Sequence, residues 1–522
     1  MSNPLPRRTA LRTAAAAVVG VASAGGLAAC TGSDAEGDAG RGSGSGSGSA
    51  APADDGRLRR HEVVPGTPEQ AGTLDPTAAG GAAAATLAAS RALVASASIV
   101  VVTSDLESDL ASGTAAAVRL GIPLLVQGPG VASELDRLGV RTVVRFSADA
   151  AVPTTFGDLE VVDGAGELSD LPGLPLTPQR DRATVLVLAG AKVPAGVTAT
   201  LTAVGASRLP VKYTDPRTAD DVRAALSEAP STAVLAVGAG FGPAGRFAQR
   251  VRTARHAPEL PGGGLLPFPG RRMVALYGHP ATAALGMLGE QSAVESVERV
   301  KAVADRYQDL TRTTVVPAFE LIATVASGSA QRDGTYSRRT SVSTLLPWVQ
   351  AAERAGVYVV LDLQPGRADF LTQAKQYEPL LRRPWVGLAL DPEWRLGPKE
   401  KPLRQIGHVG VDEVNRVGSW LAELVREHDL PPKVLTLHQF SLSMVRDRDR
   451  LDTSIDEVQW LVHADGQGGQ GAKQGTWAAL KRHLPEGVWL GWKNFEDEDT
   501  PMLTPEQTMA QVHPTPYFVS YQ

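Results

Sequence analysis

The chain has 522 residues, more than one ordinary hydrophobic core accommodates, so two globular units with appended segments are expected. Hydrophobic residues make up 43% of the sequence and charged residues 20%, which is typical of globular proteins and not of disordered ones. A formal net charge of −5 argues against nucleic acid as a partner, and a single cysteine excludes an internal disulfide framework and a cysteine metal cluster.

The first thirty residues predict an export signal. Arg7 and Arg8 precede an apolar run, Ala14 to Ala29, that is too short and too rich in glycine for a transmembrane anchor. Its end, Leu27-Ala28-Ala29-Cys30, resembles the lipobox of bacterial lipoproteins, which implies cleavage before Cys30 and lipidation of its sulfur. The arginine pair also resembles a twin-arginine signal, so the export route stays open. We therefore expect an exported protein, lipid-anchored at the outer face of the cytoplasmic membrane or in the cell wall.

Residues 31–60 are expected to form a flexible linker. The tract from Gly42 to Ser49 alternates glycine and serine, so it has no side chains that could build a core. Such a tether would let the folded part of the chain stand away from the membrane.

Residues 61–265 predict a Rossmann-like, three-layer α/β domain. Apolar runs that alternate with alanine-rich helical stretches predict buried strands at Ser98–Thr103, Pro123–Gln127, Thr142–Phe146, Thr184–Ala189 and Thr232–Val237. The first tryptophan is Trp348, and this change in composition supports a boundary near Pro261–Pro269, where Gly and Pro suit a linker.

Part of this domain is similar to the cell-wall-binding repeat of clostridial and actinobacterial surface proteins. The similarity lies in Val100–Val126, with a strand, an acidic loop containing Asp105 and Asp109, a small-residue helix and then Gly121-Ile122-Pro123; Leu135–Val144 continues it. The resemblance implies anchoring to wall polymer. A generic Rossmann-like half-domain without a ligand remains the alternative.

Two glycine-rich loops do not predict nucleotide binding. Gly238–Gly242 follows a strand, but Pro243 displaces the third glycine of a dinucleotide fingerprint. Gly466–Gly471 lacks the Gly-Lys-Ser/Thr ending of a P-loop. We expect no nucleotide partner.

Residues 271–522 predict a (β/α)8 barrel that lacks a final helix. Eight short apolar runs, most of them separated by helix-like stretches, alternate in the manner of this fold. They are Met273–His279, Thr314–Glu320, Val357–Asp362, Val386–Glu393, Val434–His438, Gln459–Asp465, Val488–Lys493 and Pro516–Tyr521. Pro317 cannot donate to a strand ladder, so the second strand is expected to be short or displaced.

Polar residues at the ends of these runs predict a site at the barrel mouth, where such barrels place their chemistry. Side chains alternate across a strand, so Asp391 and Glu393 are both expected to point inward. The same parity places further groups inward, with Lys493 less certain in direction: Tyr277, His279, Glu320, Asp362, His438, His463 and Asp465.

Converging carboxylates push one pKa up and leave a neighbour ionised, which supplies both an acid and a base. We expect Glu393 to be the general acid, Asp391 to orient it or raise its pKa, and Asp465 or Asp362 to be the second carboxylate. Glu320 completes the catalytic candidates. The substrate-binding candidates are His279, Tyr277, His438, Gln439, His463, Lys493, Trp394 and Trp492.

Asp391-Pro392-Glu393 at the end of a fourth barrel strand resembles the barrel-type muramidases and, more loosely, the chitinase-like hydrolases. The resemblance implies that Glu393 is a proton donor in a glycoside hydrolase acting on a cell-envelope glycan. The muramidase first-strand Asp has no counterpart, because His279 stands there. The whole arrangement also resembles uncharacterised actinobacterial surface lipoproteins.

Two alternatives remain open. A divalent metal could be held by His279, His438, His463, Asp391 and Asp465, although no His-x-His or His-Glu-x-x-His is present. A metal-dependent hydrolase is therefore an alternative, although we expect neither a resident metal nor another cofactor. A non-catalytic glycan-binding lipoprotein is the other alternative, because this fold hosts unrelated functions.

Overall fold

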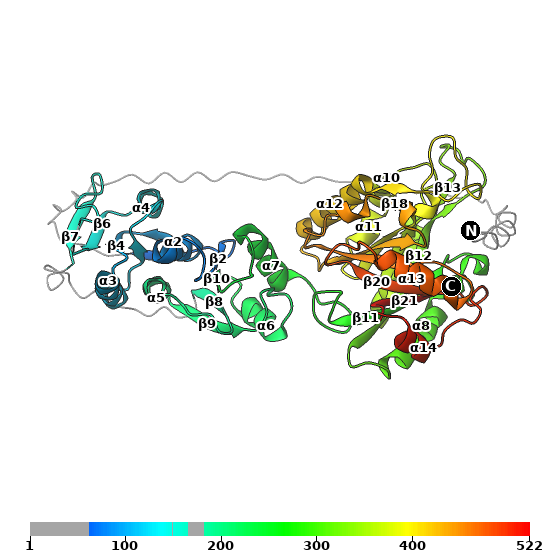
Figure 1. Cartoon of the computed structure of the whole chain (residues 1–522), viewed down its shortest axis with the longest axis horizontal. Coiled ribbons are helices and arrows are strands. Elements are labelled where there is room, and N and C mark those ends of the chain that lie inside the picture. Colours follow the sequence, from blue (N-terminus) through cyan, green and yellow to red (C-terminus); the bar gives the residue numbers. More distant parts are fainter. Residues whose placement is uncertain (1–61, 149, 165–181) are drawn as a thin grey trace, which may run out of the picture.

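The computed structural model describes residues 62–148, 150–164 and 182–522. The expected signal peptide, lipobox and linker lie outside the described residues. Two folded bodies follow one another along the chain and are joined after helix α7 (Ala244–His256), as Figure 1 shows. Among the described residues, no helix combines the length and apolar character that a membrane span requires.

The first body is a Rossmann-like α/β domain with two parallel four-stranded sheets. One sheet has the order β5-β4-β6-β7 and the other β2-β10-β8-β9. Their strands are β2 (Ala71–Leu74), β4 (Ile99–Thr103), β5 (Leu124–Val126), β6 (Thr142–Phe146), β7 (Glu160–Asp163), β8 (Ala183–Leu188), β9 (Ala206–Val211) and β10 (Ala233–Val237). A short antiparallel pair, β1 (Val63–Pro65) and β3 (Val94–Ala97), accompanies them.

The helices of this domain are α2 (Gly81–Leu93), α3 (Glu107–Leu120), α4 (Val131–Leu138), α5 (Ala195–Ala203), α6 (Asp220–Glu228) and α7. Alanine and other small residues let α2 pack closely against α5 and against strands of both sheets. The five strands predicted from sequence are all present. The sequence did not predict β2, β7 and β9, whose exposed or partly exposed residues give a weak apolar signal.

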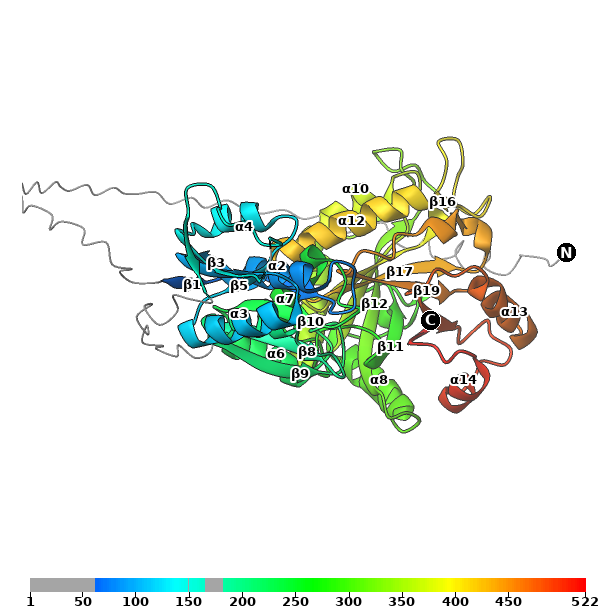
Figure 2. The same ribbon diagram turned by 60° about the vertical axis from the view of Figure 1, so that its left-hand side comes forward.

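The two bodies contact each other through ion pairs made by α7. Arg250 binds Asp456 in a fork, with Nε–Oδ2 and Nη2–Oδ1 distances of 2.6 and 2.8 Å. Arg252 binds Asp429 in the same manner. In Figure 1, α7 lies at the end of the first domain that faces the barrel, and in Figure 2 the first domain is turned forward.

The segment between the bodies closes the bottom of the barrel. Phe268 is fully buried and packs against the rings of Trp489 and Tyr517. The Trp385 indole donates to the Glu259 carbonyl at 2.7 Å. The Gly- and Pro-rich stretch expected to be a linker therefore contributes to the barrel core.

The second body is a closed barrel of eight parallel strands. The order is β11-β21-β20-β19-β17-β15-β14-β12, and β12 pairs with β11 to close the circle. The strands are β11 (Arg271–Gly278), β12 (Thr314–Ala326), β14 (Tyr358–Leu363), β15 (Val386–Leu390), β17 (Lys433–Gln439), β19 (Val458–Ala464), β20 (Trp489–Asn494) and β21 (Phe518–Tyr521). No described helix follows β21, so the predicted fold is confirmed.

The expectation of a short second strand was wrong, because β12 is a 13-residue strand. Pro317 is paired only with Val274 of β11, since the pairing with β14 begins one residue later, at Ala318. Its missing N–H therefore costs no ladder hydrogen bond on the β14 side. Beyond the barrel, β12 continues into a hairpin with β13 (Ser337–Arg339).

Helices surround most of the barrel. They are α8 (Ala293–Gln308), α9 (Val342–Ala355), α10 (Phe370–Ala374), α11 (Glu378–Leu381), α12 (Val411–Glu427), α13 (Gln470–Lys481) and α14 (Pro505–Gln511). In α12, Val414, Val417, Leu421 and Val425 are buried at helical spacing, which turns one apolar stripe onto the strands. The described chain between β17 and β19 contains only short 3-10 turns and β18 (Val445–Arg446).

The barrel interior has two chemically different layers. The lower one is apolar and includes Met273, Val316, Val360, Leu461 and Phe518. The upper layer, two to four residues further along each strand, is polar. Because all strands are parallel, these polar groups gather at one end, the mouth.

Candidate active site at the barrel mouth

Six strands bring seven buried polar or charged side chains into the upper barrel. They are Tyr277, Glu320, Asp362, His438, His463, Asp465 and Lys493, to which Asp391 adds a group just after β15. Each has at most 4% of its surface exposed. Groups of this kind are rarely buried unless they are paired, so a charge network is expected.

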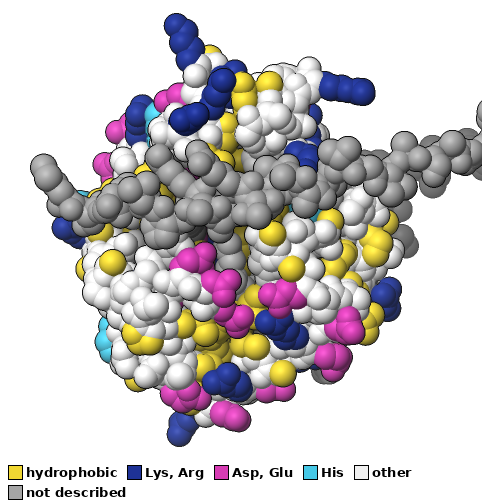
Figure 3. Space-filling model, turned by 90° about the vertical axis from the view of Figure 1, so that its right-hand side faces the viewer, with side chains coloured by type: hydrophobic (Ala, Val, Ile, Leu, Met, Phe, Trp, Pro, Cys, Tyr) yellow, Lys and Arg dark blue, Asp and Glu magenta, His cyan; other side chains and the backbone are white. Residues whose placement is uncertain are grey.

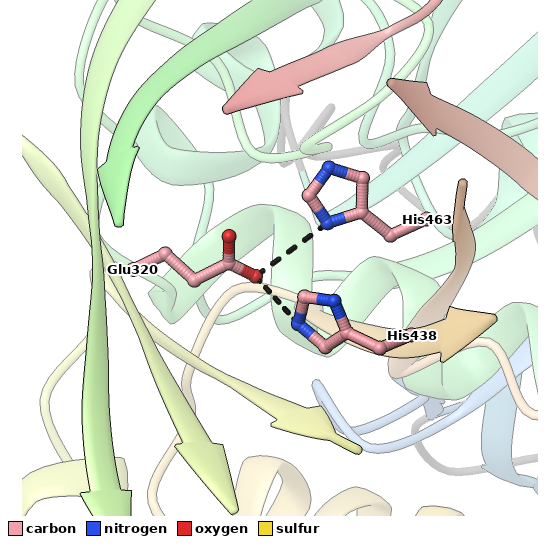
Figure 4. Close-up of side chains that lie close together, drawn as sticks. All are labelled: Glu320, His438 and His463. Carbon is pink, nitrogen blue, oxygen red and sulfur yellow. Dashed lines mark ion pairs between the residues drawn. The ribbon is translucent and has the colours of Figure 1, made fainter. Parts of the chain in front are cut away.

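His438 is the centre of that network. Its Nε2 lies 2.9 Å from Glu320 Oε1 and 3.8 Å from Asp362 Oδ1, and its Nδ1 lies 3.5 Å from Asp465 Oδ2. His463, its register partner on β19, directs Nδ1 to Glu320 Oε1 at 3.7 Å. Figure 4 shows both imidazole rings turned toward the Glu320 carboxylate.

Lys493 and Tyr277 complete the network on the other side of the barrel. The Lys493 ammonium lies 3.1 Å from Asp465 Oδ1 and 3.5 Å from the centre of the Tyr277 ring. The Tyr277 hydroxyl donates to Asp362 Oδ2 at 2.8 Å. Lys493 therefore points inward, which sequence parity had left less certain.

The buried network carries shifted pKa values. Burial favours neutral Glu320, but the charges of His438 and His463 outweigh it and hold its pKa well below the usual range. Burial also opposes a charged His438, yet the Glu320 charge raises the His438 pKa well above its usual value. In His463 burial prevails, and its pKa is lowered. An ionised glutamate and an imidazolium thus lie side by side.

Two aspartates resist ionisation. Burial raises the pKa of Asp362 to about 6, although nearby His438 opposes the shift. Burial raises the pKa of Asp391 well above its usual value, and the charge of Asp362 adds to the effect. Burial thus favours the protonated form of Asp391.

A small pocket, with a cavity volume of about 90 Å³, lies above the network. Its lining is Tyr277, Ala284, Leu285, Ile322, Gln364, Asp391, Glu393, Trp394, Asp465, Lys493, Phe495, Glu498 and Gln522. Figure 3 views the molecule from the side where β13 and the C-terminus lie in Figure 1. Acidic side chains gather near the middle of that face, and several Lys and Arg side chains project from its edges.

Glu393 lies in this lining, but not on a strand. After Asp391 the chain turns into the 3-10 helix η4 (Pro392–Trp394), and the Asp391 carboxylate caps it by accepting from the Glu393 N–H at 3.2 Å. Strand parity therefore does not extend to Glu393. Its charge is one of the causes that raise the Asp391 pKa.

Three sequence candidates do not join the network. His279 bonds the Thr340 hydroxyl through Nε2 at 2.9 Å and accepts from the Ala281 N–H through Nδ1. Gln439 accepts from Arg448, and Trp492 packs on Trp477 in a cluster outside the barrel. Strand alternation explains the last two, because each is next to an inward residue and must face outward. Trp394, by contrast, does line the pocket.

Gln364 and Ser520 were not among the sequence candidates. Gln364 lines the pocket and donates to the Tyr277 hydroxyl at 3.4 Å. Ser520 and His463 Nε2 are hydrogen-bonded at 3.2 Å. Gln364 has the same inward parity as Asp362, two residues before it, so counting every second residue would have found it.

A metal could be held by Glu320, His438 and His463, whose ligand atoms all lie within 4.8 Å of one another. Of the five metal-ligand candidates from sequence, only the two strand histidines belong to this group. In the first domain, Asp109 accepts from Ser104 Oγ and the Ala148 N–H, so it stabilises its loop, whereas Asp105 is exposed.

No protein-family model matches the sequence, and no curated protein matches it either. Among solved structures, the chain is similar to a xylanase and alpha-amylase inhibitor protein from Scadoxus multiflorus. The identity is 12%, and the match covers 48% of this chain and 93% of that one. With a TM-score of 0.29, this likeness supports no conclusion about fold or function.

Proposed function

We propose that the barrel is a glycoside hydrolase that acts on a cell-envelope polysaccharide. The observation that carries the proposal is a pair of carboxyl groups in the pocket with different surroundings. Burial and Asp362 raise the pKa of Asp391, which favours its protonated form. Asp465 lies beside the Lys493 ammonium, which favours its ionised form. Glycoside hydrolysis requires one acid and one carboxylate.

In this proposal Asp391 donates its proton to the glycosidic oxygen while the bond from that oxygen to the anomeric carbon breaks. Asp465 supplies the second carboxylate, either as the nucleophile or as the base that takes a proton from water. Asp391 thus takes the donor role that the muramidase resemblance gave to Glu393. Glu393 stays at the pocket rim, where it can accept hydrogen bonds from sugar hydroxyls.

The remaining lining suits a carbohydrate. Trp394, Phe495 and Tyr277 offer aromatic surfaces on which the apolar face of a sugar ring can pack. Gln364 and Gln522 offer amide groups for hydroxyls. Apolar surface with a few convergent polar groups is the usual character of a small-molecule site.

We also propose that the protein reaches this substrate from the membrane. Lipidation at Cys30 and the residue 31–60 tether would place both domains outside the cytoplasm, and the first domain would bind wall polymer. Incorporation of a labelled fatty acid into wild type but not into Cys30→Ala would support the anchor. Equal labelling of both would contradict it.

The direct test of activity is a screen of residues 31–522 against purified envelope polysaccharides, with detection of new reducing ends. Wild type should release them from at least one polymer, and Asp465→Asn should not. Binding without any product would favour the non-catalytic alternative, and turnover that yields no reducing ends and stops on chelation would favour the metal-dependent one. Either result would overturn the glycosidase proposal.

A further inference from the structure

We propose that Glu320, His438 and His463 form a binding site for a divalent transition-metal ion beneath the catalytic pocket. The inference goes beyond the proposed function, because none of the three residues lines the pocket or takes part in the acid–base pair. Its support is geometric and comes from three different strands, β12, β17 and β19.

The three ligand atoms have the spacing that one small ion requires. A tetrahedral ion with bonds of about 2.0–2.1 Å holds its ligand atoms roughly 3.3 Å apart. Glu320 Oε1 lies 2.9 Å from His438 Nε2 and 3.7 Å from His463 Nδ1, on either side of that value. All three atoms, shown in Figure 4, lie within 4.8 Å of one another, so small movements of the side chains would seat an ion among them.

The same atoms form ion pairs, at 2.9 and 3.7 Å, but no hydrogen bond of acceptable geometry among the described residues. Within the part of the chain that the structure describes, Glu320 Oε1 and Oε2, His438 Nε2 and His463 Nδ1 are buried without a hydrogen-bond partner of acceptable geometry. Buried polar atoms are almost always satisfied, and each such exception needs an explanation. A metal ion would give one partner to Glu320 and to both imidazoles.

A polar group lies beside the second nitrogen of each histidine, hydrogen-bonded to His463 but only ion-paired with His438. The Ser520 hydroxyl lies 3.2 Å from His463 Nε2, which leaves Nδ1 to face Glu320. Asp465 Oδ2 lies 3.5 Å from His438 Nδ1, which leaves Nε2 to face Glu320. Metal-bound histidines commonly hold a carboxylate or another polar group on the second nitrogen in this way.

The donor set selects the class of ion. Two imidazoles and one carboxylate suit zinc and similar transition ions, whereas calcium and magnesium prefer oxygen ligands alone. Three protein ligands leave a position for water. Asp362 Oδ1 lies 3.8 Å from His438 Nε2 and has no hydrogen-bond partner within the described residues, so it could accept a hydrogen bond from that water.

The test is calorimetric titration of Zn²⁺ into untagged, chelator-treated residues 31–522. We expect one ion per chain for wild type and loss of binding in Glu320→Gln and His438→Gln. Ser520→Ala should bind about 10- to 100-fold more weakly, because it removes only the orienting hydroxyl. His279→Gln is the matched control and should bind as wild type does.

Circular dichroism of each variant checks that it folds. If the ligand variants do not fold, the thermal midpoint of wild type should still rise with Zn²⁺ and fall back with chelator, while Ser520→Ala shows a smaller rise. Failure of wild type to bind one ion, or equal binding by folded ligand variants, would overturn the metal site. Because binding is measured without substrate, these outcomes are separate from the fate of the glycosidase proposal.

Discussion

The Lys493 ammonium lies 3.1 Å from Oδ1 of Asp465, and both groups line the pocket above the barrel network. The pair is almost fully buried, with side-chain exposures of 1% and 3%. Lys493 also covers the face of Tyr277, whose hydroxyl donates to Asp362. Lys493 thus contacts Asp465 directly and Asp362 through the Tyr277 ring.

Lys493→Met should lower kcat/KM strongly, by about 100-fold or more, because Asp465 would lose the charge that favours its reactive form. Stability should also fall by about 3 kcal/mol, since removal of one partner leaves a buried charge unpaired. Reducing-end assays and chemical denaturation measure the two effects.

The double variant Lys493→Met, Asp465→Asn is the control for this prediction. It should regain part of the lost stability, because no unpaired charge remains, but it should stay inactive. A double variant no more stable than the single one would show that the Lys493 stem, and not its charge, supports the barrel.

His279 should make the protein less stable in mild acid. Burial, with a smaller effect from Arg338, lowers the His279 pKa to about 4 from an ordinary value near 6.5. The unfolded chain therefore binds more protons between these values, and stability is lost as pH falls from about 6.5 toward 4. When the pH falls from 7 to 5, the free energy of unfolding should decrease in both proteins. The decrease should be about 1 to 2 kcal/mol smaller in His279→Gln than in wild type. Equal losses, measured by denaturant unfolding, would contradict this account.

The last strand should be essential for barrel closure. β21 pairs with β20 on one side and with β11 on the other, and Phe518 is fully buried in the lower layer. A chain ending at Tyr517 should lose the cooperative thermal transition of the barrel, while a chain lacking only Gln522 should keep it. A cooperative melt in both would show that the barrel tolerates an open seam.

The Arg250–Asp456 fork should hold the two domains together. Its side chains are 15% and 17% exposed, whereas those of the Arg252–Asp429 pair are 53% and 37% exposed. Arg250→Ala should therefore increase the radius of gyration in small-angle scattering more than Arg252→Ala does, because exposed pairs contribute little. Identical scattering from all three proteins would assign docking to other contacts.

Strand periodicity predicted most of the fold, because buried parallel strands give continuous apolar runs that one sequence shows plainly. It failed where exposure weakens that signal, as in β7 and β9, and at Pro317. The proline argument assumed pairing on both sides, yet β14 begins its pairing with β12 only at Ala318. Register of this kind depends on neighbouring strands and is not visible in a single segment.

Parity also predicted most of the site, and it failed where the chain leaves the strand. Glu393 was treated as a strand residue, but the Asp391 cap turns the chain into a 3-10 helix before it. The raised pKa values of Asp362 and Asp391 come mainly from burial, which cannot be read from residue spacing. His279 does not contact the network, because it is hydrogen-bonded to Thr340, which lies 61 residues further along the chain. Spacing along one strand could not predict this contact.

The most direct test of the central claim is the dependence of kcat/KM on pH and on the leaving group for wild type and Asp391→Asn. The proton donor must be protonated, so wild-type activity should fall as pH rises through the Asp391 pKa. In Asp391→Asn that alkaline limb should disappear. The loss should be about 100-fold or more on the natural polymer but small on aryl glycosides whose leaving groups need no proton. An unchanged alkaline limb, or an equal loss on both substrates, would contradict Asp391 as the acid.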